Sequence, residues 1–135
     1  MRQRFNCLVA ILGVLLVGAS PVFAHHSVVG QFDTAKSLTL KGSISKVQWM
    51  NPHIYVYLEV KEADGTESSW ALETLPTAMM RKAGLSKEAV MGTPGEVVTV
   101  LIIPARDGTK HLGWISKITY ADGRYYALGG AGPVQ

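Results

Sequence analysis

The chain has 135 residues, with 13 Lys or Arg against 10 Asp or Glu, so its formal net charge is +3 at pH 7. The basic residues form no run or stripe, which argues against nucleic acid as a partner. The length is enough for one domain with its own core but not for two. Cys7 is the only cysteine, which excludes an internal disulfide.

The first 24 residues have the three-part layout of a secretory signal peptide. Arg2 and Arg4 give a basic start, an apolar run covers residues 7–17, and Val22 and Ala24 occupy the −3 and −1 positions of the cleavage site. The apolar run is shorter than the ~20 residues of a membrane-spanning helix, and no later segment is apolar enough to span. We therefore predict cleavage after Ala24 and a periplasmic or secreted mature protein.

The mature chain is expected to have three parts. Residues 25–36 show no clear period, which predicts an extended, flexible N-terminal arm. Residues 37–128 carry the strand patterns and form the domain. Residues 129–135 form a flexible tail.

The clearest strand covers residues 53–60, where Ile54, Val56 and Leu58 alternate with Tyr55 and Tyr57. Because side chains alternate across a strand, the aliphatic set is expected to face the core and the tyrosines the opposite side. The preceding strand, residues 38–49, has a glycine at position 42 that predicts a bulge or bend.

Further strands are predicted at residues 67–73, 97–103, 114–120 and 124–128, with a short helix near residues 74–83. This order predicts an OB-like five-stranded Greek-key barrel with one short helix between the third and fourth strands. The alternative is an open antiparallel sheet with one helix packed across it.

Three sequence elements resemble an uncharacterised family of small exported proteobacterial proteins. They are His25-His26-Ser27 after Ala24, Trp49-x-Asn51-Pro52-His53, and the run Pro-Gly-Glu-Val-Val-Thr-Val at residues 94–100. The similarity extends over most of residues 24–128. It implies a single exported domain, it brings no established activity, and it does not extend to His111.

The histidines are the main functional signal. Cleavage after Ala24 would give His25 a free amine beside its imidazole, and these two nitrogens with a second imidazole suit Cu(II). His53 and His111 lie in the loops that flank the usual ligand-binding face of an OB barrel. The sequence thus predicts a copper site formed by His25 and His53, with His26 and His111 as further candidates. Without a metal site, His25 and His26 would simply be disordered at the terminus. His53 would then serve only the turn, and His111 would be solvated in its loop.

A second candidate is the outward face of the second and third strands, with Tyr55, Tyr57, Glu59 and Glu73. Outward aromatic side chains could stack on a ligand, or residues 28–36 could cover them. This face would serve a metal-independent module that binds a small ligand or another periplasmic protein. Because the chain has no nucleophile, phosphate-loop or zinc-hydrolase motif, we expect a binding protein rather than an enzyme.

Overall fold

The computed structural model describes residues 27–129 of the chain. The predicted signal peptide, its cleavage site, His25, His26 and nearly all of the predicted tail lie outside the described residues. Within residues 27–129, no helix has the length and apolar character needed to cross a membrane.

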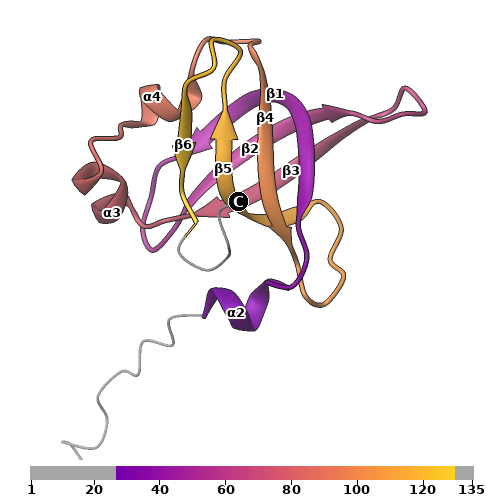
Figure 1. Cartoon of the computed structure of the whole chain (residues 1–135), viewed down its shortest axis with the longest axis horizontal. Coiled ribbons are helices and arrows are strands. Elements are labelled where there is room, and N and C mark those ends of the chain that lie inside the picture. Colours follow the sequence, from indigo (N-terminus) through magenta and orange to yellow (C-terminus); the bar gives the residue numbers. More distant parts are fainter. Residues whose placement is uncertain (1–26, 130–135) are drawn as a thin grey trace, which may run out of the picture.

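The domain is a closed β-barrel in which the strand order β3-β2-β1-β4-β5 returns to β3 through a β3–β5 pairing. This closure confirms the OB-like barrel and excludes the open sheet. β6 pairs only with β5, and two short helices rather than one connect β3 to β4 (Figure 1). The strands are β1 (Leu38–Gln48), β2 (Ile54–Lys61), β3 (Glu67–Thr74), β4 (Val97–Pro104), β5 (Leu112–Thr119) and β6 (Tyr125–Ala127), and the helices are α2 (Val28–Gln31), α3 (Thr77–Lys82) and α4 (Lys87–Met91).

The alternation predicted for β2 is confirmed. Ile54, Val56 and Leu58 are fully buried, whereas Tyr55 and Tyr57 on the other face are half-buried. All five strands of the barrel contribute aliphatic side chains to one core, and Trp70 packs at its margin. The hydrophobic pattern of β2 therefore sets which of its residues can form an external site.

The first strand curls because it pairs with β2 and β4 at once. Gly42 lies opposite Val60 on one side and Val98 on the other. A Cβ at Gly42 would clash with the carbonyl oxygen of Glu59, so glycine is required for close backbone approach. The bulge expected at Gly42 lies instead near Ser45, where the register with β2 shifts.

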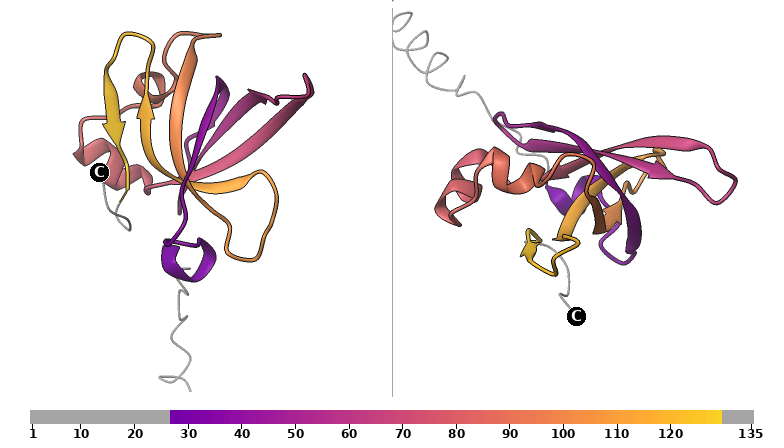
Figure 2. Two further views of the ribbon diagram at one scale, coloured as in Figure 1. Left: turned by 45° about the vertical axis from the view of Figure 1, so that its right-hand side comes forward. Right: turned by 90° about the horizontal axis from the view of Figure 1, so that it is seen from above.

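Residues 27–36, called here the N-terminal segment, do not form the expected flexible arm. Val28–Gln31 makes one helical turn, and Phe32 bridges to Ala105 and is 1% exposed. The Arg106 side chain donates to the carbonyl oxygens of Val29 (3.1 Å) and Phe32 (3.1 Å). The segment docks because Phe32 buries its ring against Ile103 and Trp114, a tertiary contact that no local period predicts. The ribbon of α2 lies outside the barrel strands (Figure 2).

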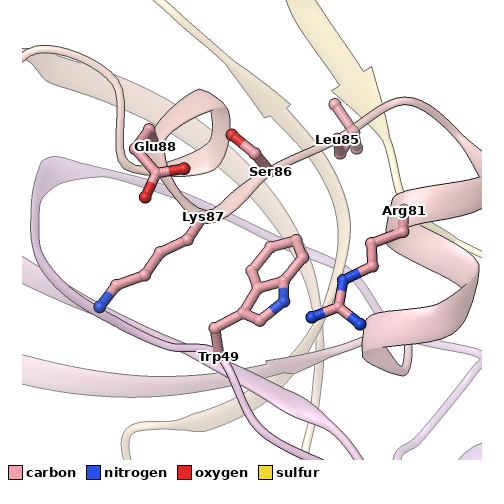
Figure 3. A pocket seen from close by; sticks show the side chains of 6 residues that line it. All are labelled: Trp49, Arg81, Leu85, Ser86, Lys87 and Glu88. Carbon is pink, nitrogen blue, oxygen red and sulfur yellow. The ribbon is translucent and has the colours of Figure 1, made fainter.

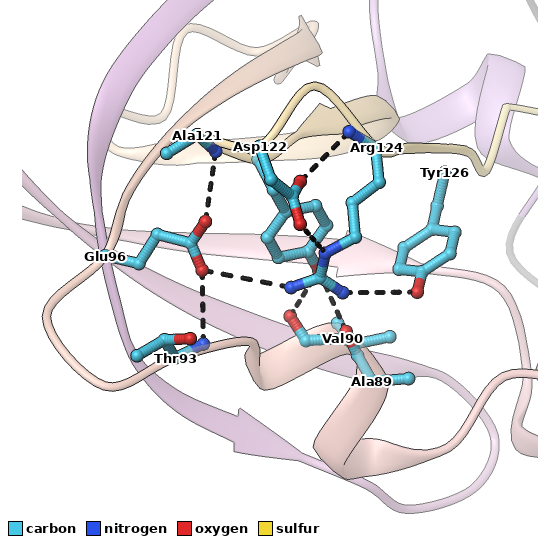
Figure 4. A network of polar contacts seen from close by, with 9 residues as sticks. Ala89, Val90, Thr93, Glu96, Ala121, Asp122, Arg124 and Tyr126 are labelled. Atoms are coloured by element: carbon cyan, nitrogen blue, oxygen red, sulfur yellow. Dashed lines mark hydrogen bonds and ion pairs between the residues drawn. The ribbon is translucent and has the colours of Figure 1, made fainter.

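The helix α4 is tied to the strands at the opposite end of the chain (Figure 4). Tyr120 donates from its hydroxyl to the carbonyl oxygen of Val90 at 2.6 Å, and the Arg124 guanidinium lies 4.0 Å from the centre of the Tyr120 ring. Glu96 accepts from the backbone amides of Thr93 (3.2 Å) and Ala121 (3.0 Å). These contacts hold α4 and the turn before β4 against the turn that follows β5.

The face assignment of β2 is tested by two neighbouring substitutions. Leu58→Ala removes a fully buried side chain and should lower the free energy of unfolding by about 2–5 kcal/mol. Glu59→Ala removes two exposed hydrogen bonds, from Ser45 and Ser69, and should cost about 1 kcal/mol or less. Urea denaturation of the mature chain measures both, and equal losses would contradict the assignment.

Candidate functional site

A buried carboxylate lies at the centre of the candidate site. Glu73, near the end of β3, is only 6% exposed although it occupies an outward position of the strand. Its Oε2 accepts a hydrogen bond from the Tyr55 hydroxyl at 2.9 Å, and its Oε1 lies 2.7 Å from Nδ1 of His53. A carboxylate removed from water is costly unless such groups compensate its charge.

His53 directly follows the Asn51–Pro52 turn and precedes β2, so the turn aims its ring back over the sheet. The side chain is 18% exposed. Nδ1 is close to Oε1 of Glu73, but the direction of its N–H does not meet the geometry of a hydrogen bond. With the buried Nδ1 turned toward Glu73, Nε2 is the ring nitrogen that remains for a ligand.

Trp114 connects this cluster to the N-terminal segment. The centre of its ring system lies 5.9 Å from the His53 ring, in an edge-on arrangement, and 5.9 Å from the Phe32 ring. The indole is 2% exposed, and its Nε1 has no acceptor among the described residues. Phe32 and His53 therefore contact the same aromatic side chain, although they are distant in sequence.

The described chain begins beside this cluster. Ser27, Gly30, Gln31 and Tyr55 line an open depression of about 650 Å³. Since the Tyr55 hydroxyl is bonded to Glu73, the depression adjoins the buried carboxylate. Ser27, the first residue that the structure describes, therefore lies at the margin of the candidate site.

The structure places His111 away from His53. His111 is exposed, has a positive φ of 57°, and packs edge-on against Trp70 at 5.2 Å. Trp70 precedes Glu73 by three positions on β3, a separation of roughly 10 Å along a strand. The structure does not bring His111 into the cluster around Glu73.

Only part of the predicted face of tyrosines and glutamates belongs to the candidate site. Tyr57 donates its hydroxyl to Gln48, and Glu59 accepts from the hydroxyls of Ser45 and Ser69. These polar groups pair with residues outside the cluster around Glu73, so only Tyr55 and Glu73 belong to the candidate site.

The described residues alone do not complete a metal site. No group of three or more His, Cys, Asp or Glu suited to a metal ion occurs within residues 27–129. Within these residues, His53 contributes the imidazole that lies beside Glu73.

Comparison with known protein families identifies the family of this chain. The profile of a family of unknown function (DUF6152) matches residues 13–114. The chain belongs to this family. The matched range of DUF6152 includes the N-terminal segment, His53, Glu73 and Trp114, and it confirms the resemblance noted in the sequence. Neither the curated proteins nor the solved structures contain a match to this chain.

Sequence reasoning did not anticipate the parts played by Trp114, Phe32 and Arg106 in this DUF6152 domain. The contact of Trp114 with His53 depends on the β3–β5 pairing that closes the barrel, which no local pattern in the sequence predicts. Arg106 lies in a polar loop that carries no motif. Phe32 belongs to residues 28–36, for which the sequence predicts only that they could cover the tyrosines.

The Tyr55–Glu73 contact predicts a measurable titration. Burial, followed by the hydrogen bond to Glu73, raises the pKa of Tyr55 from 10.0 to about 12. Because the folded state favours the neutral phenol, this contribution to stability is present below pH 10 and is lost as the pH rises through about 12.

Glu73→Gln should therefore lower the pKa of Tyr55 while leaving it above 10.0, because burial is the larger cause. The ¹³Cζ chemical shift of Tyr55, followed by NMR from neutral to alkaline pH, measures this change. An unchanged pKa in the variant would show that the Glu73 carboxylate does not act on Tyr55.

Proposed function

We propose that this chain is an exported copper-binding protein of the periplasm or extracellular medium, which holds one Cu(II) ion between His53 and the mature amino terminus at His25. The observation that carries the proposal is the contact of His53 Nδ1 with the buried Glu73 carboxylate. Metal-binding histidines commonly direct their second ring nitrogen to a carboxylate, which orients the ring and strengthens the ligand.

The charge balance of the site supports the same conclusion. Glu73 is buried, and the neutral Tyr55 hydroxyl cannot cancel its negative charge. A cation bound at Nε2 of His53 would provide the positive charge that a neutral imidazole lacks. Metal and proton thus compete for the same ring, and copper affinity should fall as the pH is lowered.

The position of the N-terminal segment supports His25 as the partner ligand. His25 precedes Ser27 by two residues, a reach of at most about 7 Å for extended chain. Ser27 lines the same depression as Tyr55, which contacts Glu73. Because residues 28–32 are already docked on the barrel, their conformational entropy need not be lost when the metal binds.

Copper is favoured over other divalent ions by the donor set. A terminal amine and two imidazoles are nitrogen ligands, and Cu(II) stands at the top of the affinity order for such sites. A complex formed by the terminal His25 and His26 alone would bind the same ion. It is the main alternative to a site shared by His25 and His53. His111 has no place in either arrangement.

Copper titration of the mature chain, in competition with a chelator of known affinity, tests the site. His53→Ala should weaken Cu(II) binding by about a hundredfold or more, because it removes a ligand. Glu73→Gln should weaken binding by about 10–100-fold, the usual effect of losing the carboxylate behind a ligating histidine. His111→Ala, the matched control, should leave the affinity unchanged.

The same titration has a contradicting outcome. Equal copper affinity with and without His53 would show that the ion binds only to the terminal residues. One added residue ahead of His25 should abolish the terminal chelate. If that extended chain binds copper as well as the native one, the amine of His25 is not a ligand.

A further inference from the structure

A second pocket lies between the end of β1 and the two helices that follow β3. It has a volume of about 470 Å³ and is lined by Trp49, Arg81, Leu85, Ser86, Lys87 and Glu88 (Figure 3). The metal proposal uses none of these residues. Their side chains combine an aromatic wall with two cations, which is an arrangement suited to an organic anion.

The two cations of the pocket are free to act on a ligand. Arg81 and Lys87 are exposed, and neither forms an ion pair with a carboxylate in the part of the chain that the structure describes. Glu88 is the only acidic residue that lines the pocket. Hydrogen bonds to its own backbone amide and to Ser86 lower the pKa of Glu88, so it stays ionised. The lining therefore carries a net positive charge.

Trp49 supplies both an apolar surface and a hydrogen-bond donor. Its ring packs against the margin of the core, as does Leu85. The N–H edge of the indole points toward the Arg81 guanidinium (Figure 3). Both groups are donors and cannot satisfy each other, so an acceptor placed between them would receive hydrogen bonds from both.

The walls of the pocket are held in position before any ligand binds. The hydroxyl of Ser86 accepts from the amide of Ala89 at 3.2 Å and begins α4, which Tyr120 anchors through Val90. The start of α3 is joined to the turn after Trp49, because Thr77 donates to Asn51 Oδ1 at 2.7 Å. A preorganised pocket loses less entropy when it binds a small ligand.

We propose that this pocket binds a small organic carboxylate with a planar apolar body. The carboxylate would pair with the Arg81 guanidinium, whose planar donors match its geometry, and accept from the Trp49 indole. The apolar body would lie against the indole ring and Leu85. Lys87 adds positive potential at the rim. This inference is independent of the copper site.

Phenylacetate and its neutral analogue phenylacetamide test the proposal by ¹H–¹⁵N NMR titration of the mature chain. Phenylacetate should shift the Trp49 indole signal in a saturable way and bind at least about tenfold more tightly than the amide, the effect expected for a charged hydrogen bond. Acetate tests the charge alone and should bind at least about tenfold more weakly than phenylacetate.

Arg81→Gln should weaken phenylacetate binding by at least about tenfold. Lys82→Gln changes the neighbouring cation on the same helix, which does not line the pocket, and should have no effect. Equal affinity for acid and amide, equal effects of the two substitutions, or a Trp49 signal that does not shift would each overturn the proposal. A peptide with a C-terminal phenylalanine and a free carboxylate is a further probe. Binding as tight as that of phenylacetate would support the carboxylate site and would identify peptide C-termini as ligands.

Discussion

The barrel closes through a short parallel pairing of β3 with β5, and the candidate metal site depends on that contact. Gly113 lies opposite Leu72 in this pairing, and on its other side a Cβ would come within 2.6 Å of the Ile102 side chain of β4. The pairing places Trp114 opposite Glu73. Without closure, Glu73 would be an ordinary outward carboxylate of a hairpin. With closure it is buried opposite an indole, and His53 and Tyr55 are its polar partners.

The N-terminal segment covers the other side of the same indole. Phe32 packs on Trp114, and Arg106 fastens the segment through its backbone carbonyl groups. The site is therefore assembled from three parts of the chain that are distant in sequence: the N-terminal segment, the start of β2, and the paired ends of β3 and β5. The N-terminal segment and His53 thus contact the same indole from different sides of the site.

Local patterns were enough to predict much of the fold. The alternation in β2 identified its buried and outward faces, and the strand order indicated an OB-like barrel. The same alternation could not show that Glu73 is buried, because what covers an outward face is a tertiary property. For the same reason the docking of Phe32 could not be predicted from a segment without periodicity. His53 was identified from its position, but its partner Glu73 was assigned only to a ligand-binding face.

The central claim is that His53 and the amino terminus share one copper ion. Pulsed electron paramagnetic resonance of the Cu(II)-loaded mature chain measures this directly, because coordinated imidazoles modulate the signal through their remote nitrogen. The account predicts two coordinated imidazoles in the native chain and one after His53→Ala. A spectrum that is the same with and without His53 would contradict it.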